Sequence, residues 1–240
     1  LNLTNRVALI NGGSRGIGAA IAGAFAEHGA SVVVASRKQE GVDAVAATIR
    51  EAGGEATGIA CHAGKTEAVD ALFARIAAEF GRLDILVNNA ATNPYFGPLI
   101  DMPEAAYDKT FDVNCKGYFL MAQRAGRMMA EQGSGCIINI ASGEGESPEP
   151  NTGVYAMTKA TNIMLTRVLA KELGRAGVRS NCICPGLTET RLSEALVGNP
   201  ELLEQYTAQA PLGRHGQPDE MVGAALYLAS AAASYTNGAI

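Results

Sequence analysis

Short apolar runs rich in β-branched residues alternate with amphipathic helical segments along the whole chain, and this alternation restricts the fold more than any other feature. The runs are Val7–Ile10, Val32–Ala35, Thr57–Ala60, Ile85–Val87, Cys136–Ile140 and Val178–Ile183. Several are apolar at every position, as expected of parallel strands that helices cover on both faces. Alternation of this kind predicts βαβ units and a doubly wound parallel sheet.

The segments between the runs carry apolar residues at intervals of three and four, the period of an amphipathic helix. The clearest stripe comprises Val69, Leu72, Phe73, Ile76, Ala77 and Phe80. We therefore expect an α/β fold of Rossmann type, with a sheet of about six or seven parallel strands and helices on both faces. No linker, repeat or low-complexity segment divides the chain, so residues 1–240 are predicted to form one domain.

The composition excludes several classes of protein. With 19 basic against 24 acidic residues, the chain has no basic footprint for nucleic acid or an anionic membrane. No apolar run approaches the ~18 residues of a membrane span, and the N-terminus lacks the apolar core of a signal peptide. The five cysteines lack CxxC spacing and the three histidines are scattered, so neither a metal site nor a disulfide framework is predicted. We expect a reduced, cytoplasmic protein.

A glycine-rich turn follows the first run and leads into a helix. It reads Asn11-Gly12-Gly13-Ser14-Arg15-Gly16-Ile17-Gly18, a GxxxGxG spacing rather than the GxGxxG of the standard dinucleotide fingerprint. Glycine lets a pyrophosphate approach the backbone at a helix N-terminus, where free N–H groups and the helix dipole favour anions. An ordinary tight turn could look the same, but the place of this one in the first βαβ unit favours cofactor binding. The candidate residues are Gly12, Ser14, Arg15, Gly16, Ile17 and Gly18.

The end of the second predicted strand indicates which cofactor is bound. NAD enzymes usually carry an acidic residue about 20 residues beyond the glycine turn, where it holds the ribose hydroxyls. Here the strand ends in Ser36-Arg37-Lys38, without an acid. Ser36 leaves room, and Arg37 together with Arg15 would bracket a 2′-phosphate through charge-assisted contacts. Arg37 and Lys38 could instead be solvated surface charges, but the missing acid favours NADP(H).

Tyr155 and Lys159 are four residues apart at the start of a predicted helix, Val154–Arg175, so both lie on one face. Ser142 ends the fifth run, and the intervening loop could bring the three side chains together. A tyrosine with a pKa of ~10 is a poor acid–base catalyst at neutral pH, but a nearby ammonium lowers that pKa. A serine hydroxyl would hold a substrate oxygen where the tyrosine exchanges its proton. Taken alone, Tyr155 and Lys159 could also be an ordinary helix-surface pair.

Six motifs in a fixed order make the whole chain resemble the short-chain dehydrogenase/reductase family. They are the glycine turn, Asn88-Asn89-Ala90-Ala91, Asn114 within Asp112-Val113-Asn114, Ser142, Tyr155-xxx-Lys159, and Cys184-Pro185-Gly186-Leu187-Thr188-Glu189-Thr190. Each motif alone has an alternative as a turn or a core strand, and only their joint order argues against coincidence.

The resemblance implies catalytic roles. Tyr155 would be the general acid–base, and Lys159 would lower its pKa and bind the nicotinamide ribose. Ser142 would orient the carbonyl, and Asn114 would hold a water that joins Lys159 to a proton relay.

The resemblance also implies cofactor contacts. Asn89 and Ala90 would border the adenosine side, while the nicotinamide would pack on Ile183, Pro185, Gly186 and Thr188. His62 stands where the family commonly has an aspartate that meets the adenine amino group. A neutral imidazole could accept that bond or stack on the ring, although a half-buried histidine is often structural. Asn11 replaces the usual threonine and keeps a hydrogen-bonding side chain.

Three stretches look most like NADP-dependent carbonyl reductases and retinol dehydrogenases: Ser36–Gln39, Cys61–Lys65 and Asn89–Pro94. The family normally continues beyond Thr236–Ile240 into a seventh strand and a glycine-bearing tail. Its members usually pair two long helices, here about Glu104–Gln132 and Val154–Arg175, across a two-fold axis. A homodimer or homotetramer is therefore expected.

The substrate pocket is expected to be lined by 93–96, 144–151 and 190–208. The last stretch is predicted to form one or two amphipathic helices that act as a lid, with an ordinary surface helix as the alternative. Glu144, Glu146 and Glu149 are unusual beside a carbonyl site. If one faces inward, a fatty chain would be disfavoured by desolvation and a small polar or amine-bearing ketone would fit better; otherwise all three point to solvent.

The sequence therefore predicts an NADP(H)-dependent oxidoreductase that interconverts a small carbonyl compound and an alcohol. A 3-oxoacyl-thioester reductase is the alternative within the enzyme class, with Arg124, Arg127 and Arg175 as a patch for an acidic carrier protein. A non-catalytic dinucleotide-binding protein is the alternative outside it.

Overall fold

The computed structural model describes residues 1–240 and is organised around one parallel β-sheet with strand order β3-β2-β1-β4-β5-β6. The strands are β1 (Val7–Asn11), β2 (Ser31–Ser36), β3 (Glu55–Ala60), β4 (Ile85–Asn88), β5 (Gly135–Ile140) and β6 (Val178–Ile183). Each predicted apolar run lies within one of these strands. The doubly wound α/β fold, with a sheet of six strands, is therefore confirmed.

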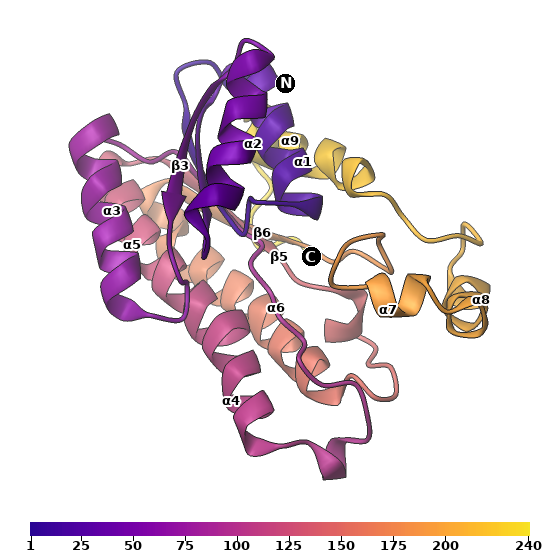
Figure 1. The fold of residues 1–240 in the computed structure, drawn as a ribbon. Helices are drawn as coiled ribbons and strands as arrows, with labels where there is room; N and C mark the ends of the chain where they lie inside the picture. The colour runs from indigo at the N-terminus through magenta and orange to yellow at the C-terminus, as the bar shows by residue number, and fades with distance from the viewer.

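Helices cover both faces of the sheet, as Figure 1 shows. One face carries α1 (Gly16–Glu27), α2 (Gln39–Glu51) and α9 (Val222–Ala229); the other carries α3 (Thr66–Phe80), α5 (Gly117–Gln132) and α6 (Gly153–Leu173). The side chains of β1 alternate between the two cores, because successive residues of a strand point to opposite faces. Ala8 and Ile10 lie in the core under α1, whereas Val7 and Leu9 lie in the core under α5.

The long helix expected over about Glu104–Gln132 is interrupted in the structure. It consists of α4 (Glu104–Phe111) and α5, joined by a π-helical turn, η2 (Asp112–Lys116). A π turn inserts an extra residue and often marks a functional site. Here it lies beside α6 and buries Val113 and Asn114.

The remaining elements are short. The 3₁₀ turns are η1 (Leu99–Asp101), η3 (Gly143–Gly145), η4 (Gly174–Ala176), η5 (Pro218–Met221) and η6 (Ala231–Ala233). The stretch predicted as a lid forms two helices, α7 (Glu194–Val197) and α8 (Pro200–Gln209), which project from the body of the molecule in Figure 1. No helix combines the length and the apolar character that crossing a bilayer requires.

The C-terminal residues run beside β6, where the seventh strand was expected. The amide of Gly238 donates to the carbonyl of Ser180 at 2.8 Å, and the carbonyl of Ala239 accepts from the amide of Cys182 at 2.9 Å. These bonds extend the pairing of the sheet beyond β6, although the segment is too short to count as a strand.

The order of the strands decides where a ligand would bind. The chain moves outward from β1 to β3 and then returns to place β4 on the other side of β1. Loops that leave the carboxyl ends of β1 and β4 therefore diverge and open a crevice between them. The glycine turn follows β1, and Ser142 follows β5 at the same edge.

Candidate active site

The predicted catalytic side chains meet at the carboxyl edge of the sheet. Ser142 follows the end of β5, while Tyr155 and Lys159 occupy the first turns of α6. The ammonium nitrogen of Lys159 lies 5.4 Å from the centre of the Tyr155 ring, so the two side chains share one side of the helix. The hydroxyl of Ser142 acts on the Tyr155 phenol in the direction that lowers the pKa of Tyr155.

Lys159 is a buried lysine, with 2% of its surface exposed. Its Nζ donates to the carbonyl oxygen of Ile140 at 2.8 Å, and the hydroxyl of Tyr118 donates to the same oxygen at 2.9 Å. Burial penalises the ammonium and lowers the pKa of Lys159 from 10.5 to about 8. This lysine can therefore gain or lose a proton close to neutral pH.

The pKa of Tyr155 differs in direction from the expectation. Burial raises it above 10, the nearby Glu144 carboxylate raises it further, and only the hydrogen bond with Ser142 opposes them. The prediction that Lys159 lowers this pKa is not met by the chain's own groups. The physical reason is that burial of Tyr155 disfavours the phenolate and the Glu144 carboxylate adds to this effect.

Asn114 connects the loop after β4 to α6. Its Oδ1 accepts from the amide of Thr92 at 2.9 Å, and its Nδ2 donates to the Thr92 carbonyl at 3.0 Å and to the hydroxyl of Thr158 at 3.1 Å. Thr158 in turn donates to the Tyr155 carbonyl at 2.7 Å. Both amide hydrogens of Asn114 are therefore used inside the protein. Sequence analysis missed Thr158, a small residue between Tyr155 and Lys159 with no distinguishing pattern.

The glycine turn is packed too tightly for any other residue at two positions. Gly12 has a φ of +84°, and a Cβ there would lie 2.5 Å from the Ala90 amide nitrogen. A Cβ on Gly18 would lie 2.3 Å from the carbonyl oxygen of Gly12. The Asn89 side chain donates to that same oxygen at 2.9 Å. Asn89 and Ala90 thus hold the turn in place against β4.

The N-terminus of α1 is free to bind an anion. Its N-cap residue is Arg15, which makes no side-chain hydrogen bond to the first turn, so the N–H groups there have no side-chain acceptor. The hydroxyls of Ser14 and Ser36 lie 3.1 Å apart, which links the turn to the end of β2. These features fit the pyrophosphate of a dinucleotide.

Three cations lie around the expected adenosine end. Arg15 and Arg37 are exposed and belong to none of the ion pairs in the structure. Lys109 of α4 lies with its Nζ 3.4 Å from Nε2 of His62, while Nδ1 of His62 accepts from the Gly64 amide at 3.2 Å. Burial and the charge of Lys109 lower the pKa of His62, which favours the neutral imidazole. The sequence did not indicate Lys109, because it is far from any motif.

The segment after β6 lies beside the turn that follows Ser142. The carbonyl of Pro185 accepts from the amide of Gly143 at 2.9 Å, which ties this segment to the turn that follows Ser142. Gly186 is exposed, and no atom lies within 4 Å of the position of a Cβ there. The hydroxyl of Thr188 donates to the Gly186 carbonyl at 3.1 Å.

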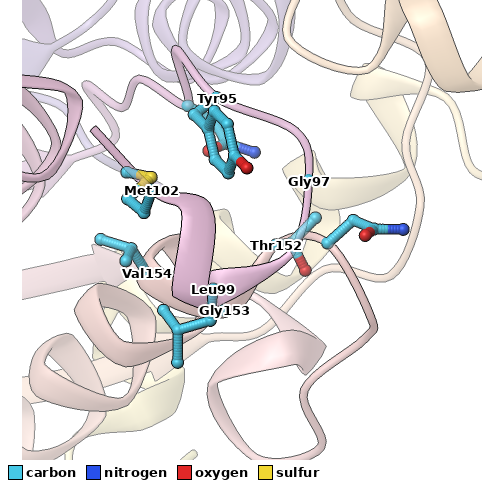
Figure 2. Close-up of a pocket in the computed structure, with 9 residues that line it drawn as sticks. Tyr95, Gly97, Leu99, Met102, Thr152, Gly153 and Val154 are labelled. Atoms are coloured by element: carbon cyan, nitrogen blue, oxygen red, sulfur yellow. The ribbon is translucent and has the colours of Figure 1, made fainter.

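A small pocket beside the start of α6 contains some of the residues expected around the substrate but none of Ser142, Tyr155 and Lys159 (Figure 2). Asn93, Tyr95 and Asn151 were expected to line it. Leu99 and Met102 are additions that the sequence did not suggest, and 190–208 contribute nothing to it. The full lining is Asn93, Tyr95, Gly97, Leu99, Met102, Asn151, Thr152, Gly153 and Val154.

The three glutamates of the loop behave differently. Glu146 is exposed, whereas Glu144 and Glu149 are half-buried. The hydroxyl of Thr152 donates to a carboxylate oxygen of Glu144, and burial raises the pKa of that carboxyl. The charges of Glu144 and Glu149 add to burial in raising the pKa of Tyr206 on α8 to about 12. Glu144 therefore contacts Thr152 and acts by its charge on Tyr155 and on Tyr206 of α8.

The fold and the site together define a Rossmann-type protein in which a serine, a tyrosine and a buried lysine converge beside a dinucleotide cradle. Comparisons with known proteins agree. A family model described as "Enoyl-(Acyl carrier protein) reductase" matches residues 12–240. The chain belongs to the short-chain dehydrogenase/reductase family.

The similar proteins are dehydrogenases and reductases. Dehydrogenase/reductase SDR family member 4 of Bos taurus is 42% identical over 236 residues, which cover 98% of this chain and 85% of that protein. A putative gluconate dehydrogenase from Agrobacterium tumefaciens superposes with a TM-score of 0.96 at 33% identity, covering 100% of this chain and 94% of the other. A gluconate 5-dehydrogenase from Burkholderia cenocepacia, in complex with NADP and tartrate, superposes with a TM-score of 0.95 at 36% identity. The match covers 99% of this chain and 93% of the other. The chain is therefore an oxidoreductase of this family.

Proposed function

We propose that the protein is an NADP(H)-dependent oxidoreductase that interconverts a ketone or aldehyde and an alcohol by hydride transfer, with Tyr155 as the general acid–base. The observation that carries this proposal is the convergence of Ser142, Tyr155 and Lys159 at the carboxyl edge of the sheet. An open helix N-terminus and a glycine cradle lie at the same edge.

The proposed chemistry assigns one task to each side chain. In reduction, the hydroxyl of Ser142 holds the carbonyl oxygen and the neutral phenol of Tyr155 donates a proton to it; oxidation runs the same steps in reverse. When bound, the nicotinamide supplies the hydride acceptor for oxidation and the hydride donor for reduction. Lys159, with a pKa of about 8, exchanges protons near neutral pH and would pass them between Tyr155 and water. Because the side-chain N–H groups of Asn114 are already bonded, the relay water would contact its main-chain carbonyl.

The choice of NADP(H) rests on charge at the end of β2. Arg37 and Arg15 are exposed cations without an acidic partner, and no carboxylate follows Ser36 to hold ribose hydroxyls. Ser36 and His62 would contact the adenosine ribose and the adenine, with Lys109 nearby. Gly12, Ser14, Gly16, Ile17 and Gly18 would surround the pyrophosphate. Pro185, Gly186 and Thr188 would support the nicotinamide.

Further parts of the proposal concern the whole molecule. Residues of α7 and α8 would close over the substrate as a lid. Exposed apolar side chains on α5 and α6, among them Phe119 (48% exposed) and Met164 (56%), support assembly into a dimer or tetramer. All five cysteines are free thiols, which supports a reducing location such as the cytoplasm.

A 3-oxoacyl-thioester reductase is less well supported by the surface charges. Arg124, one of the three arginines considered for a carrier-protein patch, is engaged by Asp70 at 2.9 Å. Arg127 and Arg175 remain exposed.

Steady-state assays with NADPH and NADH against small ketones, aldehydes and acetoacetyl thioesters test the proposal. Turnover of simple carbonyls with NADPH supports it, and turnover confined to thioesters favours the alternative. Dinucleotide binding without turnover of any carbonyl contradicts it.

A further inference from the structure

We propose that Glu144 selects the substrate of this active site. The preferred substrates carry an ammonium group on the carbon adjacent to the reacting carbinol or carbonyl carbon. The inference rests on the oxidoreductase function proposed above and adds the charge class of the substrate. It comes from the position of one carboxylate beside the reacting centre.

The backbone of Glu144 is held firmly relative to the catalytic residues. Its amide donates to the hydroxyl oxygen of Ser142 at 3.2 Å. The next residue, Gly145, packs so closely on α6 that a Cβ there would lie 2.8 Å from the Lys159 carbonyl carbon. The amide of the preceding residue, Gly143, donates a hydrogen bond to the carbonyl of Pro185 at 2.9 Å. The turn therefore has little freedom to carry Glu144 away from the site.

The side chain of Glu144 is partly withdrawn from water and is held by Thr152. It is half-buried, and its carboxylate accepts a hydrogen bond from Thr152, which also lines the pocket of Figure 2. Its charge acts on Tyr155 from α6 and on Tyr206 from α8. The carboxylate therefore exerts its charge on both the proposed acid–base and α8.

No cation of the chain pairs with this carboxylate. The seven ion pairs of the structure do not include Glu144. The charged groups that act on it are Glu149, which adds negative charge, and Lys159, which directs its Nζ to Ile140 instead. A partly desolvated carboxylate without a counter-ion is unfavourable, and a ligand that brings a cation removes that cost.

A substrate ammonium would complete this arrangement in a way that other groups would not. It donates charge-assisted hydrogen bonds to the carboxylate oxygen that Thr152 leaves free. A methyl group at the same place leaves the carboxylate unpaired, and a carboxylate there meets like charge. Discrimination by a buried polar group comes chiefly from leaving it unpaired with the wrong ligand.

A series of three alcohols with one skeleton tests this directly. In 1-amino-2-propanol, 2-butanol and 3-hydroxybutyrate, the same CH₃–CH(OH)–CH₂ unit carries an ammonium, a methyl or a carboxylate. With NADP⁺ at neutral pH, we expect kcat/KM to fall in that order. The kcat/KM for 1-amino-2-propanol should exceed that for 2-butanol by at least about tenfold.

Two variants separate the charge of Glu144 from its shape. Glu144→Gln keeps the size of the side chain and an acceptor for Thr152, and it should reduce the ratio of kcat/KM for the amino alcohol to kcat/KM for 2-butanol at least about fivefold. The ratio is the readout because the Glu144 charge also acts on Tyr155, so that the absolute rates change for every alcohol. Glu146→Gln removes an exposed charge from the same loop and should leave the ratio within about twofold, because water screens that carboxylate. Unfolding by urea checks that both variants are folded.

The outcomes distinguish this inference from the proposed function. If alcohols are oxidised but the ratio is the same in the wild type and Glu144→Gln, the role of Glu144 is wrong and the oxidoreductase function stands. If polyhydroxy alcohols exceed the amino alcohol, Glu144 acts as a neutral acceptor and the ammonium class is wrong. If no alcohol is oxidised, calorimetry with 1-amino-2-propanol still tests the inference. Binding by the wild type that is lost in Glu144→Gln supports it. Equal binding by the two proteins, or no binding by the wild type, overturns it.

Discussion

The ammonium nitrogen of Lys159 lies 5.4 Å from the centre of the Tyr155 ring, one turn earlier in α6. The same nitrogen donates a hydrogen bond to the carbonyl oxygen of Ile140 at 2.8 Å. The lysine is thus anchored to the end of β5, the strand that also leads into Ser142. This anchor fixes the amine relative to the end of β5, from which Ser142 follows.

The first prediction concerns the phenol. Tyr155→Phe removes only the hydroxyl, so NADPH binding measured by fluorescence titration should remain. Turnover should fall by at least about 10²–10⁴-fold, the usual contribution of a positioned acid–base group. Tyr235→Phe is the control, because the Tyr235 side chain is fully exposed. Turnover by Tyr155→Phe at the wild-type rate would show that the phenol has no such role.

The second prediction concerns Lys159 and pH. Burial lowers its pKa from 10.5 to about 8, so between these pH values the unfolded chain binds more protons than the folded protein. Its contribution to stability therefore rises as the pH rises from 8 to 10.5. Below pH 8 the buried charge costs about 3 kcal/mol, at about 1.4 kcal/mol per pKa unit.

Lys159→Met keeps the aliphatic length and removes the charge. We expect it to abolish turnover but to raise the free energy of unfolding at pH 7 by about 1–3 kcal/mol, less than the full cost because the bond to Ile140 is lost. The difference in free energy of unfolding between the variant and the wild type should disappear near pH 10.5. Urea denaturation of both proteins at the two pH values measures this, and an equal difference at both would contradict the shifted pKa.

The third prediction concerns cofactor choice. Arg37→Asp should weaken NADPH binding about 10- to 100-fold, since charge-assisted hydrogen bonds to a 2′-phosphate contribute about 1.5–3 kcal/mol. NADH binding should change little, because NADH lacks that phosphate. Lys171→Asp makes the same change of charge at an exposed position on α6 and controls for net charge. An unchanged preference in Arg37→Asp would argue against the assignment of NADP(H).

The fourth prediction separates backbone strain from close packing. Gly12 and Gly53 have nearly the same φ, +84° and +87°, but a Cβ on Gly12 meets Ala90 at 2.5 Å while nothing lies within 4 Å of one on Gly53. Gly53→Ala should lower the free energy of unfolding by about 1–2 kcal/mol, the energy of placing an alanine in the left-handed conformation. Gly12→Ala should cost more and also abolish dinucleotide binding. Thermal unfolding and NADPH titration of both variants test this, and equal losses of stability would show that the approach to Ala90 does not matter.

The strands and the place of the site were predictable because they depend on local pattern and on topology. The runs Val7–Ile10 and Cys136–Ile140 are apolar enough to be buried in a parallel sheet whatever packs on them. Once the strands are parallel, the turn after β1 and the residue after β5 must emerge at the same edge. The four-residue spacing of Tyr155 and Lys159 placed both on one side of a helix without further information.

Other features depended on contacts between distant segments. Nothing local marks Lys109 as a neighbour of His62, or Leu99 and Met102 as the lining of a pocket with Thr152. The π turn around Asn114 replaced the expected uninterrupted helix. The sequence offered three glutamates with equal claims, and only the packed turn after Ser142 separates Glu144 from the exposed Glu146.

The sequence by itself determined the order of strands and helices along the chain, the glycines of the turn after β1 and the candidate catalytic side chains, because periodicity, steric freedom and residue chemistry are local properties. Only the tertiary structure decided the protonation behaviour of those side chains. The pKa of Lys159 falls and that of Tyr155 rises because both are removed from water by segments distant in sequence. Solvation is a property of the assembled fold, and no spacing of residues along the chain encodes it.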